Sequence, residues 1–175
     1  MICVCDIDGV LANFIQPACT IHGKRFPYDD PLNLGIYDLA KLFRISQEHF
    51  MAPLNEEFYA NLPKTPHADA IINRLEAHFG FENVYFLTMP VPTPGCLEGK
   101  RLWIDRNYPE YLRRFLIGYP KHICAHRNSI LFDDCEKNVY RFAEAGGRAF
   151  LVPALWNKKH AENPFAAITR FLEVL

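Results

Sequence analysis

The sequence has no excess of charge of either sign. Its 175 residues include 19 Lys and Arg against 20 Asp and Glu, and half of all residues are hydrophobic. This balance excludes the broad positive field that draws proteins onto nucleic acid polymers, so any bound anion must be held by local groups. A chain of this length and hydrophobicity is expected to form one compact domain with its own core and a small insertion.

Long hydrophobic runs are also missing. No segment approaches the length needed to span a bilayer, and no basic leader followed by a long apolar stretch opens the chain. We therefore expect a cytoplasmic protein with no membrane partner. The sequence leaves its oligomeric state open, a homodimer included.

Paired cysteines are absent as well. The six cysteines are scattered along a chain too large to need disulfide bonds, so we expect all of them to be reduced. Cys3 and Cys5 would share one face of a strand. No two cysteines have the two intervening residues of a Cys-x-x-Cys zinc site. A structural zinc is therefore not expected.

Short apolar runs, most of them ending in Asp or Thr, recur along the chain. They lie at 2–6, 84–88, 129–134 and 148–152, and a further short strand is expected at 113–117. Stretches with helical spacing alternate with them at 68–79, 97–107, 136–145 and 164–175. This alternation predicts an α/β fold with a Rossmann-like, doubly wound parallel sheet.

Residues 15–63 interrupt this alternation. They contain turns around Gly23, Pro27 and residues 29–31, two weakly helical pieces at 36–43 and 46–51, and many aromatic side chains. We interpret the segment as a small helical cap inserted after the first strand. Residues 1–14 and 64–175 would then form the α/β core.

Acidic side chains gather where the expected strands end. Asp6 and Asp8 follow the first strand, and Asp133 and Asp134 end another. For an isolated Asp-x-Asp pair, a helix N-cap or a solvated turn is the commoner explanation. The carboxyl ends of parallel strands meet at one edge, however, so these acids and Thr88 are expected to converge in one crevice.

Such a crevice suits phosphoryl transfer. Oxygen ligands favour a hard cation such as Mg²⁺, one carboxylate can attack phosphorus, and a second can move a proton. Asp8 is placed to protonate the leaving oxygen and later to activate water, which makes it the general acid and base. Thr88 and Lys121 would hold the transferring oxygens, although a lone lysine in a loop is more often a solvated charge.

The run Asp6 to Phe14, DIDGVLANF, resembles the first motif of haloacid dehalogenase-like (HAD) phosphatases, in particular the 5'(3')-deoxyribonucleotidases. Phe86 to Pro90 resemble their second motif, Lys121 stands where the third-motif lysine is expected, and Ile130 to Asp134 resemble the fourth. The resemblance implies a Mg²⁺-dependent phosphatase that forms an aspartyl-phosphate on Asp6. It also implies that Asp6, Asp8 through its backbone carbonyl, and Asp133 bind the metal, with Asp134 in a supporting role.

The substrate implied by this resemblance is a small phosphomonoester, namely a nucleoside or deoxynucleoside monophosphate. A base stacks on aromatic faces, and Phe14, Phe26 and Tyr28 are candidates, although each could instead fill the core of the cap. Lys24 and Arg25 could reach an anionic substrate from the cap, although an exposed basic pair at a turn is usually solvated.

Three other functions stay open. A phosphatase for another phosphomonoester, such as a sugar phosphate, would share the chemistry and differ in the cap. A phospho-accepting signalling domain also uses a strand-end Asp, an acidic pair and a lysine, but it needs neither Asp8 nor a cap. A catalytically silent binding relative is disfavoured by the complete set of acids.

Overall fold

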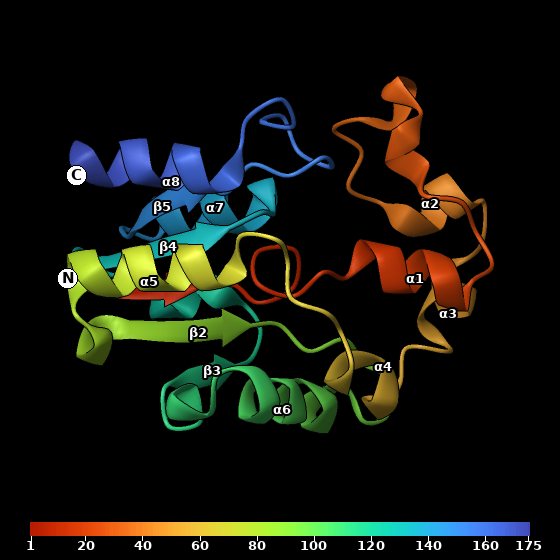
Figure 1. Cartoon of the computed structure of the whole chain (residues 1–175), viewed down its shortest axis with the longest axis horizontal. Helices are drawn as coiled ribbons and strands as arrows, with labels where there is room; N and C mark the ends of the chain where they lie inside the picture. The colour runs from red at the N-terminus through yellow and green to blue at the C-terminus, as the bar shows by residue number, and fades with distance from the viewer.

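The computed structural model describes all residues, 1–175, and contains one five-stranded sheet between helices (Figure 1). The strands are β1 (Ile2–Cys5), β2 (Val84–Thr88), β3 (Phe115–Ile117), β4 (Ser129–Asp133) and β5 (Arg148–Leu151). All neighbouring strands are parallel, in the order β3-β2-β1-β4-β5. The predicted α/β fold with a parallel sheet is therefore confirmed.

Eight α-helices accompany the sheet. They are α1 (Ile15–Ile21), α2 (Leu39–Phe43), α3 (Gln47–Met51), α4 (Glu56–Ala60), α5 (Ala68–Phe79), α6 (Cys96–Asn107), α7 (Glu136–Glu144) and α8 (Pro164–Glu173). Short 3-10 turns occur at Pro27–Asp29, Pro31–Asn33, Phe81–Asn83, Pro109–Tyr111 and Lys121–Cys124. No helix combines the length and the apolar composition that crossing a bilayer requires.

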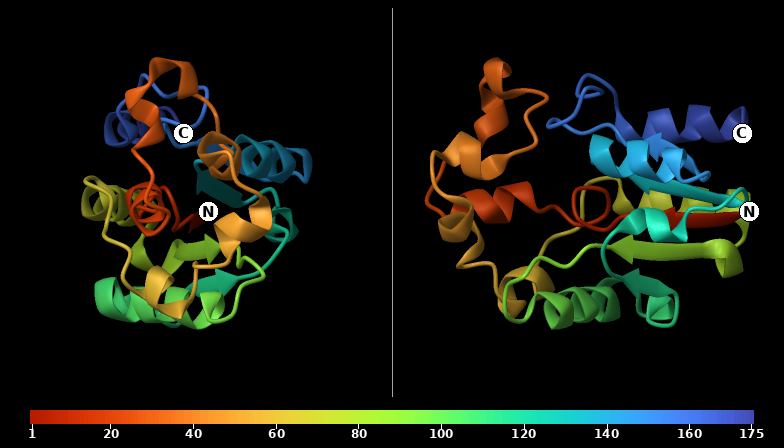
Figure 2. Two further views of the ribbon diagram at one scale, coloured as in Figure 1. Left: turned by 90° about the vertical axis from the view of Figure 1, so that its right-hand side faces the viewer. Right: turned by 180° about the vertical axis from the view of Figure 1, so that it is seen from behind.

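The helices cover both faces of the sheet. In Figure 2, α5 and α8 lie on one face and α7 lies on the other. The α5 helix has the length that its spacing predicts, because Ala68, Ile71, Ile72 and Leu75 form one buried stripe. Alternate strand residues point to opposite faces, so Val4 packs in the cluster on the α7 side while its neighbours join the main core.

The central strands are buried on both faces, as parallel strands generally are. Every residue of β4 is buried, and β1 pairs with β2 on one side and β4 on the other. In this register Cys5 lies opposite Phe132, so the residues that follow the two strands emerge side by side. The register therefore fixes where the acidic residues lie.

Helices α1 to α4 lie beyond the carboxyl ends of the strands, away from both chain termini (Figure 1). The sequence did not predict α1. Its Pro17 falls in the first turn, where backbone N–H groups have no partner within the helix, so the missing N–H of proline is tolerated. Helix α4 was also missed. The division of the chain into a core and a cap at residues 14 and 64 stays a prediction.

Several boundaries differ from those predicted. The piece expected at 36–43 begins only at Leu39, because the Asp38 side chain accepts a hydrogen bond from the Lys41 N–H and starts the helix there. The strand expected at 113–117 shortens to Phe115–Ile117. All six cysteines are free, as predicted.

Helix α4 packs closely on α6 through a glycine. A Cβ at Gly99 would lie 2.8 Å from the Tyr59 Cβ and 3.1 Å from the Glu56 Cα. Such distances leave no room for a side chain, so glycine lets the two helices approach. This contact fixes one end of the segment 15–63 against the helix that follows β2.

Candidate active site

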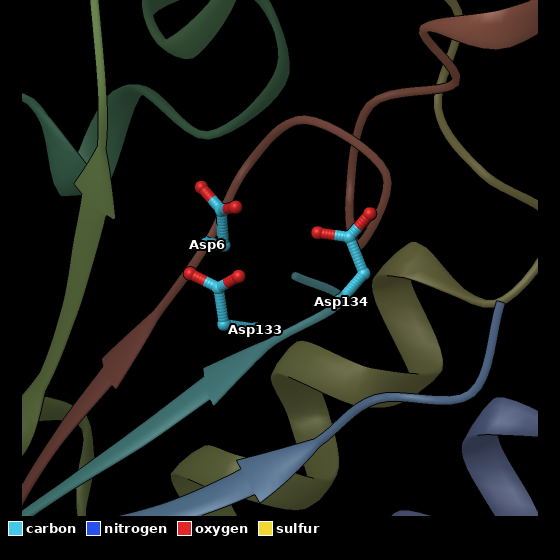
Figure 3. Close-up of side chains that lie close together, drawn as sticks. All are labelled: Asp6, Asp133 and Asp134. Atoms are coloured by element: carbon cyan, nitrogen blue, oxygen red, sulfur yellow. The ribbon is translucent and has the colours of Figure 1, made fainter. Parts of the chain in front are cut away.

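Three carboxylates meet at the carboxyl edge of the sheet, where β1 and β4 end (Figure 3). Asp6 follows β1, Asp133 ends β4 and Asp134 comes next. Each offers an oxygen within 4.8 Å of the others. The chain turns from β1 toward β2 and from β4 toward β5, so the three acids lie at the point where the strand order reverses, a frequent ligand site in such sheets.

A buried lysine lies between two of these acids. The Lys121 Nζ is 2.6 Å from Asp6 Oδ1 and 2.7 Å from Asp133 Oδ2, and the residue is only 3% exposed. Sequence reasoning placed Lys121 in the site but gave a solvated loop charge as the commoner alternative. The structure excludes that alternative for this lysine.

Backbone and amide groups fix the orientation of Asp6 and Asp133. The Ile7 N–H donates to Asp6 Oδ1 at 2.8 Å, and the Cys135 N–H donates to Asp133 Oδ1 at 2.8 Å. Asn138 Nδ2 donates to both Asp133 oxygens at 3.2 and 3.1 Å. All recorded polar contacts of the Asp6 side chain use Oδ1, so Oδ2 is left for another partner.

Asp134 has one occupied and one unoccupied oxygen. Its Oδ2 accepts a hydrogen bond from the indole N–H of Trp156, while its Oδ1 is buried without any partner. Its backbone carbonyl accepts a hydrogen bond from Asn157 Nδ2 at 2.9 Å. Sequence reasoning missed Trp156, Asn157 and Asn138, because none of them belongs to a sequence motif that indicates a contact with the acids.

Burial dominates the electrostatics of Asp6 and Asp134. It raises the pKa of Asp6 to about 7, against the opposing effect of Lys121, with Asp133 and Asp8 raising it further. Burial also raises the pKa of Asp134 well above its usual range, and the charge of Asp133 adds to this. Burial alone would lower the pKa of Lys121, but Asp6 and Asp133 raise it above its ordinary value.

Asp8 does not join the other three acids. Its Oδ2 pairs with the ammonium of Lys100, and its Oδ1 is buried without a partner. Lys100 also donates to Thr88 Oγ1 at 2.8 Å and is 2% exposed. The predicted convergence is therefore found in two adjoining groups, one around Lys121 and one around Lys100.

Lys100 was not predicted as a site residue, although the sequence carries a signal for it. The buried face of α6 consists of Cys96, Gly99, Lys100, Trp103 and Ile104. A lysine in the middle of an otherwise apolar helical stripe needs a buried partner. Trp103 packs in the core as expected, and its N–H donates to the Leu62 carbonyl at 2.7 Å.

A cavity of about 420 Å³ opens above these groups. Asp6, Asp8, Thr88 and Lys121 line its polar end, together with Asp134 and Asn138. Its other walls are mostly apolar and aromatic. Ile15, Tyr37, Leu39, Phe50, Met51 and Tyr59 come from the segment 15–63, and Phe14, Met89, Val91 and Trp156 come from outside it. The volume is within the range of small-molecule sites.

Phe14 is the only one of the three predicted stacking rings that lines this cavity. It is half-buried and packs edge-on against Phe58 at 5.4 Å. Tyr28 is buried in the core, and Phe26 lines a separate cavity with Lys24 and Arg25. Phe26, Tyr28, Lys24 and Arg25 do not line the cavity above the acids, so their contacts with a substrate stay predictions.

The donor set fits a hard divalent cation. Asp6, Asp133 and Asp134 supply carboxylate oxygens within 4.8 Å of one another, and the Asp134 Oδ1 has no partner. Lys121 is the only basic side chain paired with any of the three, and it contacts two of them. A divalent ion would satisfy both the unpaired oxygen and the uncompensated charge, and oxygen ligands are those that Mg²⁺ prefers.

No protein-family model matches the sequence, and the search of curated proteins found no match. Among solved structures, the chain is similar to a HAD-family enzyme from Bacteroides thetaiotaomicron. A mutant of that enzyme, in complex with magnesium and inorganic phosphate, is 12% identical over 92% of this chain and 98% of that chain, with a TM-score of 0.46. The magnesium complex of the same enzyme is 12% identical over 91% of this chain and 96% of that chain, with a TM-score of 0.47.

Proposed function

We propose that the protein is a Mg²⁺-dependent phosphomonoester hydrolase that forms an aspartyl-phosphate on Asp6. The observation that carries the proposal is the floor of the cavity. There Asp6 has one oxygen fixed by Lys121 and the Ile7 N–H and the other free of recorded contacts, beside two further buried acids. A carboxylate held in this way can attack phosphorus, and the group next to it can hold a cation.

In the first step, Asp6 Oδ2 would form a bond to phosphorus while the bond from phosphorus to the ester oxygen breaks. The departing alcohol oxygen takes a proton from Asp8, which lines the same cavity. Thr88 and Lys121 line the cavity as well and would contact the oxygens of the transferring group.

In the second step, water would attack the phosphorus of the aspartyl-phosphate. Asp8, now ionised, takes the proton of that water, and the Asp6 carboxylate leaves with inorganic phosphate as the product. The two steps return both aspartates to their starting states, so the cycle consumes only ester and water.

Lys100 would hold Asp8 and Thr88 in position beside the cavity. In the structure its ammonium pairs with Asp8 and donates to Thr88. Lys100 does not line the cavity itself, so it acts on the substrate mainly through Asp8 and Thr88.

Asp6, Asp133 and Asp134 would hold the Mg²⁺ ion, with the backbone carbonyl of Asp8 as a further expected ligand. Mg²⁺, when bound, neutralises the charge on the phosphoryl oxygens and so favours attack by an anion. Asp134 would then be a candidate ligand rather than only a supporting residue, because its Oδ1 is unpartnered.

We propose a nucleoside monophosphate as the substrate. The aromatic walls of the cavity, including Phe14, Tyr37 and Trp156, give flat apolar faces on which a base can stack, and stacking contributes about 1–3 kcal/mol per base. A sugar phosphate is the second candidate, and it would leave these faces without a matching partner.

The test is phosphate release from deoxynucleoside monophosphates, nucleoside monophosphates and sugar phosphates, with Mg²⁺ and with chelator. The proteins are wild type, Asp6→Asn and Asp105→Asn, a matched change of an exposed acid on α6. We expect release from nucleotides that needs both Mg²⁺ and Asp6 and is unaffected in Asp105→Asn. Release from sugar phosphates alone would refute the substrate, and full activity of Asp6→Asn would refute the mechanism.

A further inference from the structure

One tryptophan contacts the acidic cluster, the loop after β1 and the segment 15–63. Trp156 follows β5, in the blue loop that Figure 1 shows reaching toward the short helices beyond the sheet. Its indole N–H donates to Asp134 Oδ2, and its ring centroid lies 6.0 Å from that of Tyr28. A Cβ at Gly9 would lie 2.9 Å from Trp156 Cζ2 and 2.9 Å from Asp134 Cγ.

The next residue fixes the position of this tryptophan. Asn157 is 2% exposed, and its Nδ2 donates to the backbone carbonyls of Asp134 at 2.9 Å and Val152 at 2.8 Å. Its Oδ1 accepts from the Lys159 N–H at 3.0 Å. The loop is therefore attached to the backbone of Asp134, and Trp156 is attached to its side chain.

The segment 15–63 is joined to the same loop. The Gly35 N–H donates to the Leu155 carbonyl at 2.8 Å, immediately before Trp156. Tyr28, whose ring lies beside the indole, is buried, and its hydroxyl donates to the Ile36 carbonyl at 2.8 Å. Residues on both sides of the cavity thus meet at Leu155 and Trp156.

The indole N–H is suited to orienting a carboxylate. It is a donor without acceptor capacity, so it stabilises the ionised form of Asp134 in a buried place. By occupying Oδ2 it leaves Oδ1, the buried oxygen without a partner, for a ligand. Asp134 and Trp156 both pack against Gly9 so closely that a Cβ there would clash with them, and this packing holds the pair in its arrangement.

We infer that Trp156 is a positioning residue that orients Asp134 for a divalent cation and couples this carboxylate to the position of the segment 15–63 against the loop after β5. The inference rests on the proposed function, because it assumes that the acidic cluster binds Mg²⁺. Coupling of this kind is reciprocal. A cation that fixes Asp134 therefore also fixes Trp156 and makes the Gly35 to Leu155 hydrogen bond open less often.

The first test measures Mg²⁺ affinity by calorimetry in wild type, Trp156→Phe and Trp103→Phe. Trp156→Phe keeps an aromatic ring but removes the N–H, and loss of such an outer partner weakens metal binding by about 10- to 100-fold. Trp103→Phe is the matched control, because that N–H donates to the Leu62 carbonyl, and its Mg²⁺ affinity should equal that of wild type. In an Asp134→Asn background, Trp156→Phe should have little further effect.

The second test follows the coupling without relying on the Trp156 variant alone. The chain has two tryptophans, so Trp156 is the only one left in Trp103→Phe, and Mg²⁺ should change its fluorescence when tryptophan is excited selectively. Mg²⁺ should also slow hydrogen exchange of the Gly35 amide in wild type, and slow it less in Trp156→Phe.

Equal Mg²⁺ affinity in wild type and Trp156→Phe, with phosphate release intact in wild type, would overturn the inference and leave the proposed function standing. Unchanged fluorescence and unchanged Gly35 exchange in a protein that binds Mg²⁺ would also overturn it. No Mg²⁺ binding by wild type would overturn both.

Discussion

Replacing Lys121 with methionine tests whether charge holds the acidic cluster together. Lys121→Met keeps much of the side-chain volume but removes the ammonium that lies 2.6 Å from Asp6 and 2.7 Å from Asp133. Removing one partner of a buried ion pair costs about 3–5 kcal/mol, because the remaining charge is left buried and unpaired. We expect this loss in chelator at about pH 8, where protons relieve burial and repulsion less than at lower pH.

The expected loss corresponds to a clear shift in Tm. At about 2.1 cal/mol/K per residue, 175 residues have an unfolding entropy of about 0.37 kcal/mol/K, so Tm should fall by about 8–14 °C. At about pH 5 the fall should be smaller, because the raised pKa values of Asp6 and Asp134 let both acids bind protons there. Saturating Mg²⁺ at pH 8 should recover part of the loss.

Thermal unfolding followed by circular dichroism measures each of these values. Lys158→Met is the matched control, since this exposed lysine lies 3.4 Å from Glu136 Oε2 and such pairs contribute about 1 kcal/mol or less. Its Tm should change by less than about 3 °C. An equal fall for Lys121→Met at both pH values would refute the reasoning, because it would mean that the loss comes from packing and not from charge.

Three other perturbations have defined outcomes. The pKa of Asp6 is about 7 in the folded chain and near 3.8 when unfolded, so the contribution of Asp6 to the free energy of unfolding in chelator should fall as pH rises between these values. Denaturation of wild type and Asp6→Asn at several pH values measures this contribution. A stability difference that is constant with pH would contradict the prediction. Lys100→Met should lower phosphate release by about 100-fold or more, whereas Arg101→Met, on the exposed face of α6, should not; equal rates would exclude Lys100 from the site. Gly99→Ala should lower the free energy of unfolding by about 1–3 kcal/mol because the new Cβ meets α4, whereas the Cβ of Gly118→Ala enters open space. Unfolding in guanidinium chloride compares the two variants, and equal stability would mean that α4 is free to move.

The parts of the fold that the sequence predicted are those with a regular hydrophobic period. Strand β4 and helix α5 are examples, since Ile130 to Phe132 form a continuous apolar run and Ala68 to Leu75 a regular stripe. Helices α1 and α4 were missed because they have only one or two turns, and tertiary packing rather than local pattern decides such pieces.

The same distinction holds within the site. Asp6, Asp133 and Lys121 could be placed from the ends of strands and from the motifs that they resemble. Lys100 could have been noticed as a lysine within the apolar stripe of α6, but its partners Asp8 and Thr88 could not be predicted. Trp156 could not be placed, because its contact with Asp134 depends on the path of the loop after β5. Such pairings depend on the arrangement of α6 and of the loop after β5, which no local pattern reports.

The most direct test of the central claim is single-turnover kinetics of Asp8→Asn with a nitrophenyl phosphate labelled at phosphorus. The nitrophenol leaving group needs no proton, so formation of the aspartyl-phosphate should proceed without Asp8, while its hydrolysis needs Asp8 to activate water. We expect a burst of nitrophenol equal in amount to the protein, with the label on the peptide that contains Asp6, and no burst in the Asp6→Asn, Asp8→Asn double variant. Label-free protein with steady nitrophenol release, or a burst that persists without Asp6, would contradict the account.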